Sequence, residues 1–197
     1  MVKILCFITL LILSFRTLAI DLATGDVLLQ PLNCWSCELI EQEEDSLYAH
    51  AGIVINIRGQ FFVAEAIQSV HLISLEKFLQ RTKAMAQVKV LRYRFINNDL
   101  RSKITKRIIS LIGYPYDADF LWNNKVNGKE SFYCSEFVYK VFVKELTFFN
   151  LTTKKMPFKV NPKLWDQYFH GKTPRGELGI SPEDFNQSFD FFEVGFL

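Results

Sequence analysis

The feature that most constrains the fold of this 197-residue chain is a predicted β-hairpin. Residues 51–57 alternate and are rich in β-branched side chains, Arg58-Gly59 forms a tight turn, and residues 61–66 form the return strand. Because the turn of a hairpin sets the register of its strands, Val54 is expected to face Val63.

The hairpin register brings one histidine close to one carboxylate. His50 lies diagonal to Glu65 on the same strand face, and diagonal side chains are roughly 7–8 Å apart, a gap that these two side chains can close. Gly52 has no side chain and is expected to leave the space between them open. Glu65 would then fix the tautomer of the imidazole. The opposite face is expected to be core, through Ile53, Ile55, Phe62 and Ala64.

The rest of the pattern predicts a mixed α+β fold in one domain, residues 20–197. Apolar residues make up 49% of the chain and charged residues 22%, which excludes disordered and fibrous classes. Strands are expected at residues 26–30, 70–73 and 87–94, and helices at residues 35–42, 75–81, 100–112 and 131–146. Ser74 and Asp99 are the predicted N-caps of the second and third helices, and the third buries Leu100, Ile104, Ile108 and Leu111.

Cys134 is the candidate nucleophile. It lies in the segment Ser131-Phe-Tyr-Cys-Ser-Glu, where Ser131 is expected to cap a helix and place Cys134 in its first turn. A helix N-terminus lowers the pKa of a thiol, and with His50 and Glu65 the thiol forms a thiol–imidazole nucleophile. The alternative is a buried structural cysteine. His71 and His170 rank below His50 as the base, because neither has a strand-paired acid in view.

Several motifs occur in an order typical of one enzyme family. Gly25-Asp26, Tyr48-Ala-His-Ala-Gly-Ile-Val and Val63-Ala-Glu-Ala precede Gly113-Tyr-Pro-Tyr-Asp and Tyr133-Cys-Ser-Glu-Phe-Val. From about residue 25 to 165 the chain resembles the YiiX/YebB-like group of circularly permuted, NlpC-type papain-like cysteine hydrolases. The resemblance implies a small antiparallel barrel-like sheet packed against the helix that carries the nucleophile.

By position, the resemblance implies that Cys134 is the nucleophile, His50 the general base and Glu65 the polar third member. Tyr116 and Asp117 are candidates for the substrate-binding rim, with a packed aromatic loop as the equally weighted alternative. Neither a second Cys/His pair at zinc-ligand spacing nor a glycine-rich phosphate loop is present, so no metal or cofactor is expected.

Residues 1–19 read as a secretory signal peptide, with Lys3, an apolar run over residues 4–13 and Thr17-Leu-Ala19 at the cleavage site. A retained anchor is the alternative. Removing the segment takes away Lys3 and Arg16 and no acid, so the net charge falls from +2 to 0. A balanced chain argues against nucleic acid as a partner.

Three other features of the sequence give structural expectations. Cys34 and Cys37 have redox-motif spacing without a thioredoxin-like context, so we expect a local disulfide or two free thiols. The acidic run of Glu41, Glu43, Glu44 and Asp45 is expected to be solvated surface. The apolar tail, residues 189–197, is expected to be a strand or a lid, with membrane contact as the alternative.

These observations predict an exported, monomeric cysteine hydrolase, periplasmic or secreted, that cleaves amide bonds in cell-wall peptides. The first alternative is an acyl-lipid hydrolase or acyltransferase of the same chemistry, which the abundant phenylalanine and the apolar tail favour and which would bring contact with a membrane surface. The second alternative is a non-catalytic binding module that keeps the fold.

Overall fold

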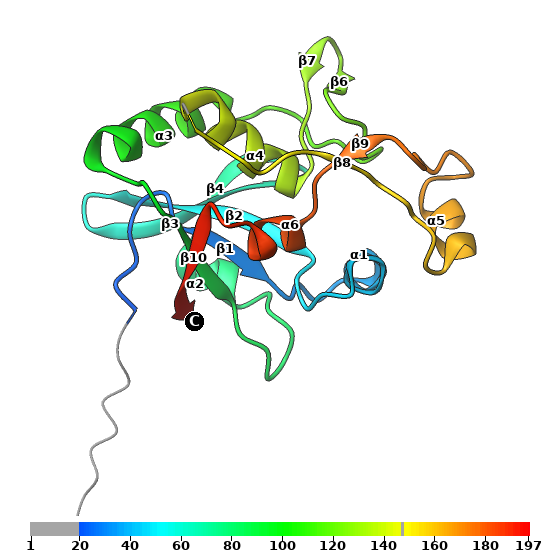
Figure 1. Cartoon of the computed structure of the whole chain (residues 1–197), viewed down its shortest axis with the longest axis horizontal. Coiled ribbons are helices and arrows are strands. Elements are labelled where there is room, and N and C mark those ends of the chain that lie inside the picture. Colours follow the sequence, from blue (N-terminus) through cyan, green and yellow to red (C-terminus); the bar gives the residue numbers. More distant parts are fainter. Residues whose placement is uncertain (1–19, 147) are drawn as a thin grey trace, which may run out of the picture.

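The structure is a computed structural model that describes residues 20–146 and 148–197, so the predicted signal peptide lies outside the described residues. Its centre is a six-stranded sheet in the order β10-β5-β1-β2-β3-β4, in which every neighbouring pair is antiparallel (Figure 1). The strands are β1 (Val27–Gln30), β2 (His50–Ile57), β3 (Gln60–Ile67), β4 (Ser69–Ser74), β5 (Lys89–Tyr93) and β10 (Phe191–Phe196).

The predicted hairpin register is confirmed. Val54 pairs with Val63, and the ladder between β2 and β3 extends from the turn to the pair of Ile53 and Ala64. Beyond that pair β3 continues beside β4 as far as Ile67, while β2 continues beside β1 back to His50. The start of β2 therefore lies outside the β2–β3 ladder.

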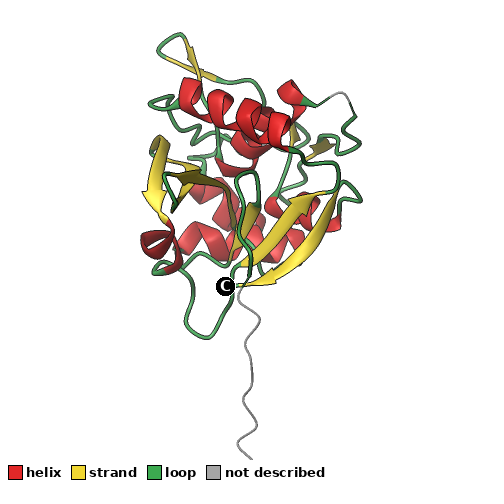
Figure 2. Cartoon of the chain, turned by 90° about the vertical axis from the view of Figure 1, so that its left-hand side faces the viewer, coloured by secondary structure: helices red, strands yellow, loops and turns green. Residues whose placement is uncertain are grey.

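Helices cover both faces of the sheet (Figure 2). One face packs against α3 (Asn98–Leu111) and α4 (Cys134–Glu145), and the other packs against α2 (Leu75–Leu79). The prediction of a single core face was therefore wrong: Ile53 belongs to the α3–α4 core, but Val54 and Val63 are equally buried beneath Phe78 of α2. The short α2 supplies this second layer.

The helix N-caps differ in part from prediction. Ser74 caps α2 as expected, through a hydrogen bond from the Lys77 amide. Asp99 does not cap α3: Asn97 accepts the Leu100 amide, and Asp99 is in the first turn, paired with Lys103. The four predicted apolar positions of α3 are buried.

The start of α4 also differs. This helix begins at Cys134, its N-cap is Tyr133, and no side chain caps it, so the predicted capping role of Ser131 was wrong. Ser131 precedes the helix by three residues and is buried. Cys134 is still in the first turn, as predicted, because the helix starts at the cysteine itself.

A smaller layer of segments lies at one end of the sheet, to the right in Figure 1. It contains α1 (Trp35–Glu44), α5 (Pro162–Tyr168) and a two-stranded ladder of β8 (Lys154–Lys155) with β9 (Leu178–Gly179). Leu39, Phe158, Trp165 and Phe169 form its own small core. A second two-stranded ladder joins β6 (Lys125–Val126) to β7 (Lys129–Glu130), and α6 (Pro182–Gln187) leads into β10.

Cys34 and Cys37 form a disulfide at the start of α1, which selects one of the two predicted alternatives. The acidic run at the end of α1 is not simply solvated. Glu43 accepts hydrogen bonds from the backbone amides of Lys159 and Val160 and from the Trp165 indole, so it ties α1 to the segment that leads into α5. Distant parts of the chain supply these donors, which no local charge pattern indicates.

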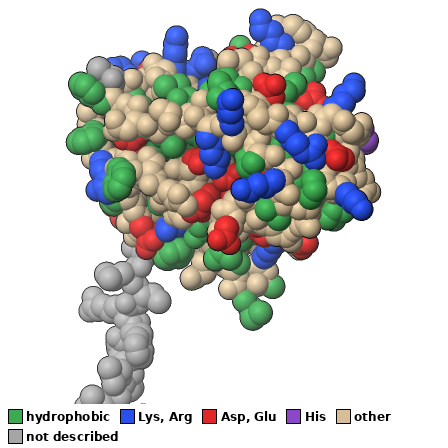
Figure 3. All heavy atoms as spheres, turned by 45° about the vertical axis from the view of Figure 1, so that its right-hand side comes forward, with side chains coloured by type: hydrophobic (Ala, Val, Ile, Leu, Met, Phe, Trp, Pro, Cys, Tyr) green, Lys and Arg blue, Asp and Glu red, His purple; other side chains and the backbone are tan. Residues whose placement is uncertain are grey.

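The surface carries both signs of charge. Figure 3 shows Lys and Arg side chains interspersed with Asp and Glu side chains on the face turned toward the viewer. In the described part of the chain, no helix combines the length and the apolar character needed to cross a membrane. The C-terminal tail forms the edge strand β10, which confirms the prediction of a strand.

Candidate active site

Cys134 is the free thiol among the described cysteines, and it is buried. Its sulfur lies 4.0 Å from the Ala49 carbonyl oxygen at the start of β2. Burial on its own raises the pKa of this thiol. The hydrogen bond with His50, the charge of His50 and the backbone N–H groups of Ala51 and Ser135 outweigh burial, so the pKa is lowered from its ordinary value. These groups therefore favour the thiolate form of Cys134 over the thiol.

His50 connects the thiol to a carboxylate. Its Nε2 is 2.7 Å from Oε2 of Glu65, which leaves Nδ1 as the ring nitrogen that faces Cys134. Burial lowers the pKa of His50, but the hydrogen bonds and charges of Cys134 and Glu65 raise it to about 9. The imidazole is therefore held protonated beside a thiol whose pKa is lowered, the arrangement expected of a cysteine nucleophile.

Glu65 is fully buried on β3. Burial raises its pKa, but the hydrogen bonds and charges of His50 and then of Arg81 lower the pKa to about 2. The carboxylate is thus ionised at neutral pH and fixes which nitrogen of His50 faces it.

The space that Gly52 was predicted to leave open is filled. A Cβ at this position would lie 2.5 Å from a methyl carbon of Val63 and 3.4 Å from the ring of Phe78. The Phe78 ring also contacts the His50 ring, with 5.8 Å between the ring centroids. The glycine therefore serves close packing of α2 against the sheet, which keeps His50 and Glu65 out of water.

A narrow apolar pocket opens beside the sulfur. Its cavity volume is about 30 Å³, and its walls come from α1, the loop after Asp117, the start of α4 and the segments on both sides of α5. Among the lining residues are Phe120, Met156, Phe158, Trp165 and Ile180. A group that enters this pocket meets mainly hydrocarbon and aromatic surface within reach of Cys134.

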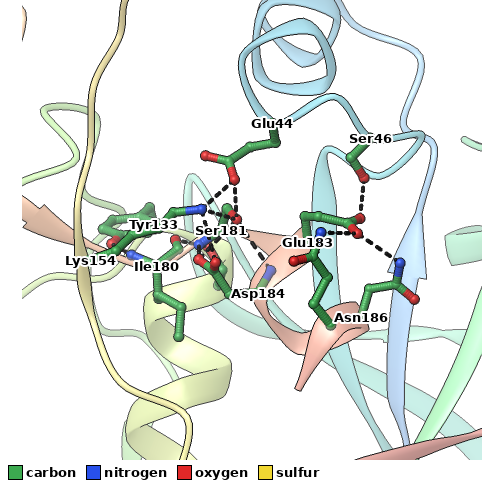
Figure 4. A network of polar contacts seen from close by, with 11 residues as sticks. Glu44, Ser46, Tyr133, Lys154, Ile180, Ser181, Glu183, Asp184 and Asn186 are labelled. Carbon is green, nitrogen blue, oxygen red and sulfur yellow. Dashed lines mark hydrogen bonds and ion pairs between the residues drawn. The ribbon is translucent and has the colours of Figure 1, made fainter. Parts of the chain in front are cut away.

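A polar network holds the wall of the pocket in place (Figure 4). The Tyr133 hydroxyl accepts the backbone N–H of Ile180, and Ser135 donates to the carbonyl of the same residue. On the outer side, Lys154 pairs with Glu44 of α1 and with Asp184 of α6. The strand segment around Ile180 is therefore fastened both to the residues next to Cys134 and to α1.

The two predicted rim residues occupy different places. Asp117 is buried, and its carboxylate accepts the backbone amides of Asp119 and Leu121 and the side-chain amide of Asn124. These contacts match the packed-loop alternative. Tyr116 lies near the thiol: burial raises its pKa well above the usual range, with the charge of Cys134 the next cause.

Comparison with known proteins places this geometry in a family. Residues 21–188 match the family described as permuted papain-like amidase enzyme, YaeF/YiiX, C92 family. The chain belongs to this amidase family. The predicted family and the predicted permuted papain-like fold are both confirmed.

Two relatives illustrate the family. An uncharacterized protein named YiiX from Escherichia coli strain K12 is 24% identical over 184 residues, which cover 88% of this chain and 86% of the relative. The crystal structure of a protein described as metalloprotein yiiX, from Escherichia coli O157:H7, matches with a TM-score of 0.78 and 22% identity, over 88% of this chain and 97% of that one.

Because that relative is described as a metalloprotein, we asked whether the residues of this chain could bind a metal. Among residues 20–146 and 148–197, no group of three or more His, Cys, Asp and Glu side chains is arranged to hold a metal ion. The cluster around Cys134 is instead joined by hydrogen bonds and ion pairs. In the part of the chain that the structure describes, these residues therefore do not form a metal site.

Sequence reasoning missed two groups at the amidase site. His71 was set aside for want of an acid, yet it pairs with Glu65 across β3 and β4, and its Nε2 is 3.2 Å from Oε1 of Glu65. Extending the hairpin register into the next strand would have found this contact. Arg81 also contacts Glu65, and no sequence pattern pointed to it because it follows α2, a separate layer of the fold.

Proposed function

We propose that this amidase is an exported cysteine hydrolase that cleaves an amide bond through Cys134, His50 and Glu65. The observation that carries the proposal is the contact of the Cys134 thiol with an imidazole whose other nitrogen is bonded to a buried carboxylate. Family membership supports amide hydrolysis. The intact set of three side chains weighs against a binding module without catalysis.

The chemistry proceeds through a thioester. The Cys134 thiolate attacks the amide carbonyl and forms a C–S bond, while backbone N–H groups at the free first turn of α4 stabilise the oxyanion. The His50 imidazolium gives its proton to the nitrogen of the leaving amine, and the C–N bond breaks. His50 then takes a proton from water, the hydroxide attacks the thioester, and the C–S bond breaks to release the acid and restore the ion pair.

Cell-wall peptides are the proposed substrate class. The disulfide of Cys34 and Cys37 supports an oxidising compartment, where such bonds persist. The signal-peptide pattern of residues 1–19 supports export. The mature protein is proposed to act as a monomer, and its balanced charge gives no reason to propose a nucleic-acid partner.

The apolar pocket favours a second candidate of the same chemistry. Phe120, Met156 and Trp165 beside the sulfur suit a hydrocarbon chain better than a polar peptide. In this candidate the scissile carbonyl belongs to an acyl-lipid, and the enzyme contacts a membrane surface to reach it.

The first test is the reactivity of Cys134 in the mature chain. We would follow alkylation by iodoacetamide against pH by mass spectrometry, in the wild type and in His50→Ala, while the Cys34–Cys37 disulfide keeps those sulfurs unreactive. A thiolate that forms below about pH 7 and disappears in His50→Ala is the expected result. If the thiol titrates in both proteins with a pKa near about 8.5, the value of a free cysteine, the proposal of an enzyme is rejected and the binding module is favoured.

A substrate panel then separates the two candidates. Cell-wall peptide amides and N-acyl amides of increasing chain length are incubated with the wild type and with Cys134→Ala. Release of amine from the peptides by the wild type alone, reduced at least about 1,000-fold in Cys134→Ala, supports the peptide amidase. Turnover that rises with acyl-chain length and is absent for the peptides supports the acyl-lipid enzyme.

A further inference from the structure

Glu65 is shared by more groups than a hydrolase triad requires. Nη2 of Arg81 donates to its Oε2 at 2.6 Å, and His50 Nε2 lies 2.7 Å from the same oxygen. His71 approaches the other oxygen, Oε1, at 3.2 Å. Arg81 and His50 therefore compete for one oxygen atom, while His71 contacts the second.

Arg81 is held in place by the backbone around it. Its guanidinium lies over the Phe78 ring, 5.3 Å from the ring centroid, so it covers the same aromatic ring that packs against His50. Its carbonyl accepts the amide of Asn33, and the adjacent Thr82 bridges to Leu32. The arginine is thus part of a second contact between the α2 layer and the sheet, and only 30% of its side chain is exposed.

We propose that Arg81 is a positioning residue that acts through Glu65: by binding the oxygen that His50 uses, it limits the hold of the carboxylate on the His50 proton. This inference rests on the proposed function, in which His50 must both give and take a proton. An unshared buried carboxylate would bind the imidazolium too firmly, and the proton would not move to the leaving amine.

The charges around Glu65 fix the direction of the effect. Three side chains face Glu65: His50 of β2, His71 of β4 and Arg81 of the segment after α2. Cys134 of α4 is linked to Glu65 through His50. Arg81 carries the permanent positive charge of this set. Removing a cation raises the proton affinity of every neighbouring group, so His50 would hold its proton to higher pH without Arg81.

The size of the effect follows from the shared oxygen. Because both nitrogens lie within hydrogen-bond distance of one atom, they are no more than about 5 Å apart. At that separation a unit charge shifts a titration by roughly 0.5 to 2 pH units between the dielectric of water and that of a protein surface. Glu65 stays in place meanwhile, since it is fully buried within β3 and His71 still contacts its other oxygen.

The test is a histidine titration by NMR in the Cys134→Ala background, which keeps the readout independent of thiol reactivity. The chain has three histidines, so His71→Gln and His170→Gln assign the signal of His50. Arg81→Gln should raise the titration midpoint of His50 by roughly 0.5 to 2 pH units, and Arg81→Lys, which keeps the charge, should restore it. Arg81→Met, which keeps an unbranched hydrocarbon side chain without the charge, should match Arg81→Gln.

Two controls separate charge from structure. Glu65→Gln should move the His50 midpoint in the opposite direction, downward. Arg92→Gln breaks a comparable pair, between the buried carboxylate of Asp26 just before β1 and the partly exposed Arg92 on β5. It should leave the midpoint of His50 unchanged.

The outcomes are distinguishable. An unchanged or lower titration midpoint of His50 in folded Arg81→Gln and Arg81→Met would overturn the role of Arg81. This holds even if alkylation of Cys134 supports the proposed function. A raised midpoint together with an unreactive Cys134 would uphold the charge coupling and reject the enzyme. In the active enzyme, the expected consequence is a pH–rate profile whose alkaline limb, set by deprotonation of His50, moves to higher pH in Arg81→Gln and returns in Arg81→Lys.

Discussion

At the scale of residues, His50 and Cys134 link folding to pH with opposite signs. The pKa of His50 is raised from 6.5 to about 9, so its contribution to stability is complete below pH 6.5 and is lost as the pH rises through about 9. The pKa of Cys134 is lowered from 9.0, so its contribution is complete above pH 9 and is lost as the pH falls through the lowered value. Where these two pH ranges overlap, the two effects cancel, because the pair holds one proton in the folded and in the unfolded chain.

This cancellation predicts an effect of removing the thiol. The free energy of unfolding of Cys134→Ala should fall as the pH rises above about 6.5, up to the pKa of His50, which lies below 9 without the thiolate. The contribution of this pair to the wild type should stay flat wherever the pH lies above the lowered pKa of Cys134 and between 6.5 and 9. Urea unfolding between pH 6 and 9.5 measures both.

The matched control is the double variant Cys134→Ala/His50→Ala, which removes both groups and should show the flat profile again. Parallel profiles for the wild type and Cys134→Ala would mean that the two groups do not form an ion pair. Glu65 does not disturb the comparison, because its pKa of about 2 puts the loss of its contribution between pH 4.5 and 2.

At the scale of elements, the start of α3 depends on a side-chain cap two residues earlier than the predicted one. Asn97 has an extended backbone and accepts the Leu100 amide at 2.9 Å. Asp99 makes only an exposed pair with Lys103. A cap satisfies a backbone donor that the helix leaves free, whereas an exposed ion pair is screened by water.

We therefore predict unequal effects of two neighbouring substitutions. Asn97→Ala should lower the free energy of unfolding by about 1 kcal/mol, and Asp99→Ala by no more than about 0.5 kcal/mol. Chemical denaturation at neutral pH distinguishes them. A larger loss of unfolding free energy in Asp99→Ala than in Asn97→Ala would indicate that Asp99, not Asn97, caps the helix.

At the scale of the whole molecule, the C-terminal strand completes the core. Phe191 of β10 is 4% exposed, and its ring contacts those of Tyr93, Phe142 and Phe185. Phe189, two residues earlier, is 89% exposed. The last strand of the chain thus joins β5 to the helix that begins at Cys134.

Substituting these two phenylalanines separates core from surface. Phe191→Ala should lower the free energy of unfolding by about 3–5 kcal/mol, because it leaves a cavity among aromatic rings. Phe189→Ala should change it by no more than about 0.5 kcal/mol. Thermal and urea unfolding measure both, and equal small effects would mean that β10 is an appendage to the fold.

Local sequence was sufficient where neighbours along the chain decide the structure. The turn at Arg58-Gly59 sets the register of β2 and β3, and the period of Leu100, Ile104 and Ile108 sets the buried face of α3. The order of the motifs along the chain indicated the family and pointed to Cys134, His50 and Glu65, which the fold brings together. Spacing within a strand or helix fixes such relations before any tertiary contact forms.

Tertiary structure alone decided what surrounds these residues. Arg81 reaches Glu65 because α2 packs on the second face of the sheet, and Glu43 meets Trp165 because α1 packs against α5. The apolar pocket is assembled from segments far apart in the chain. The sequence by itself determined which side chains can do chemistry, whereas packing between layers determined their charges, their shielding from water and the shape of the space beside the sulfur, since those properties depend on groups that meet only in the folded chain.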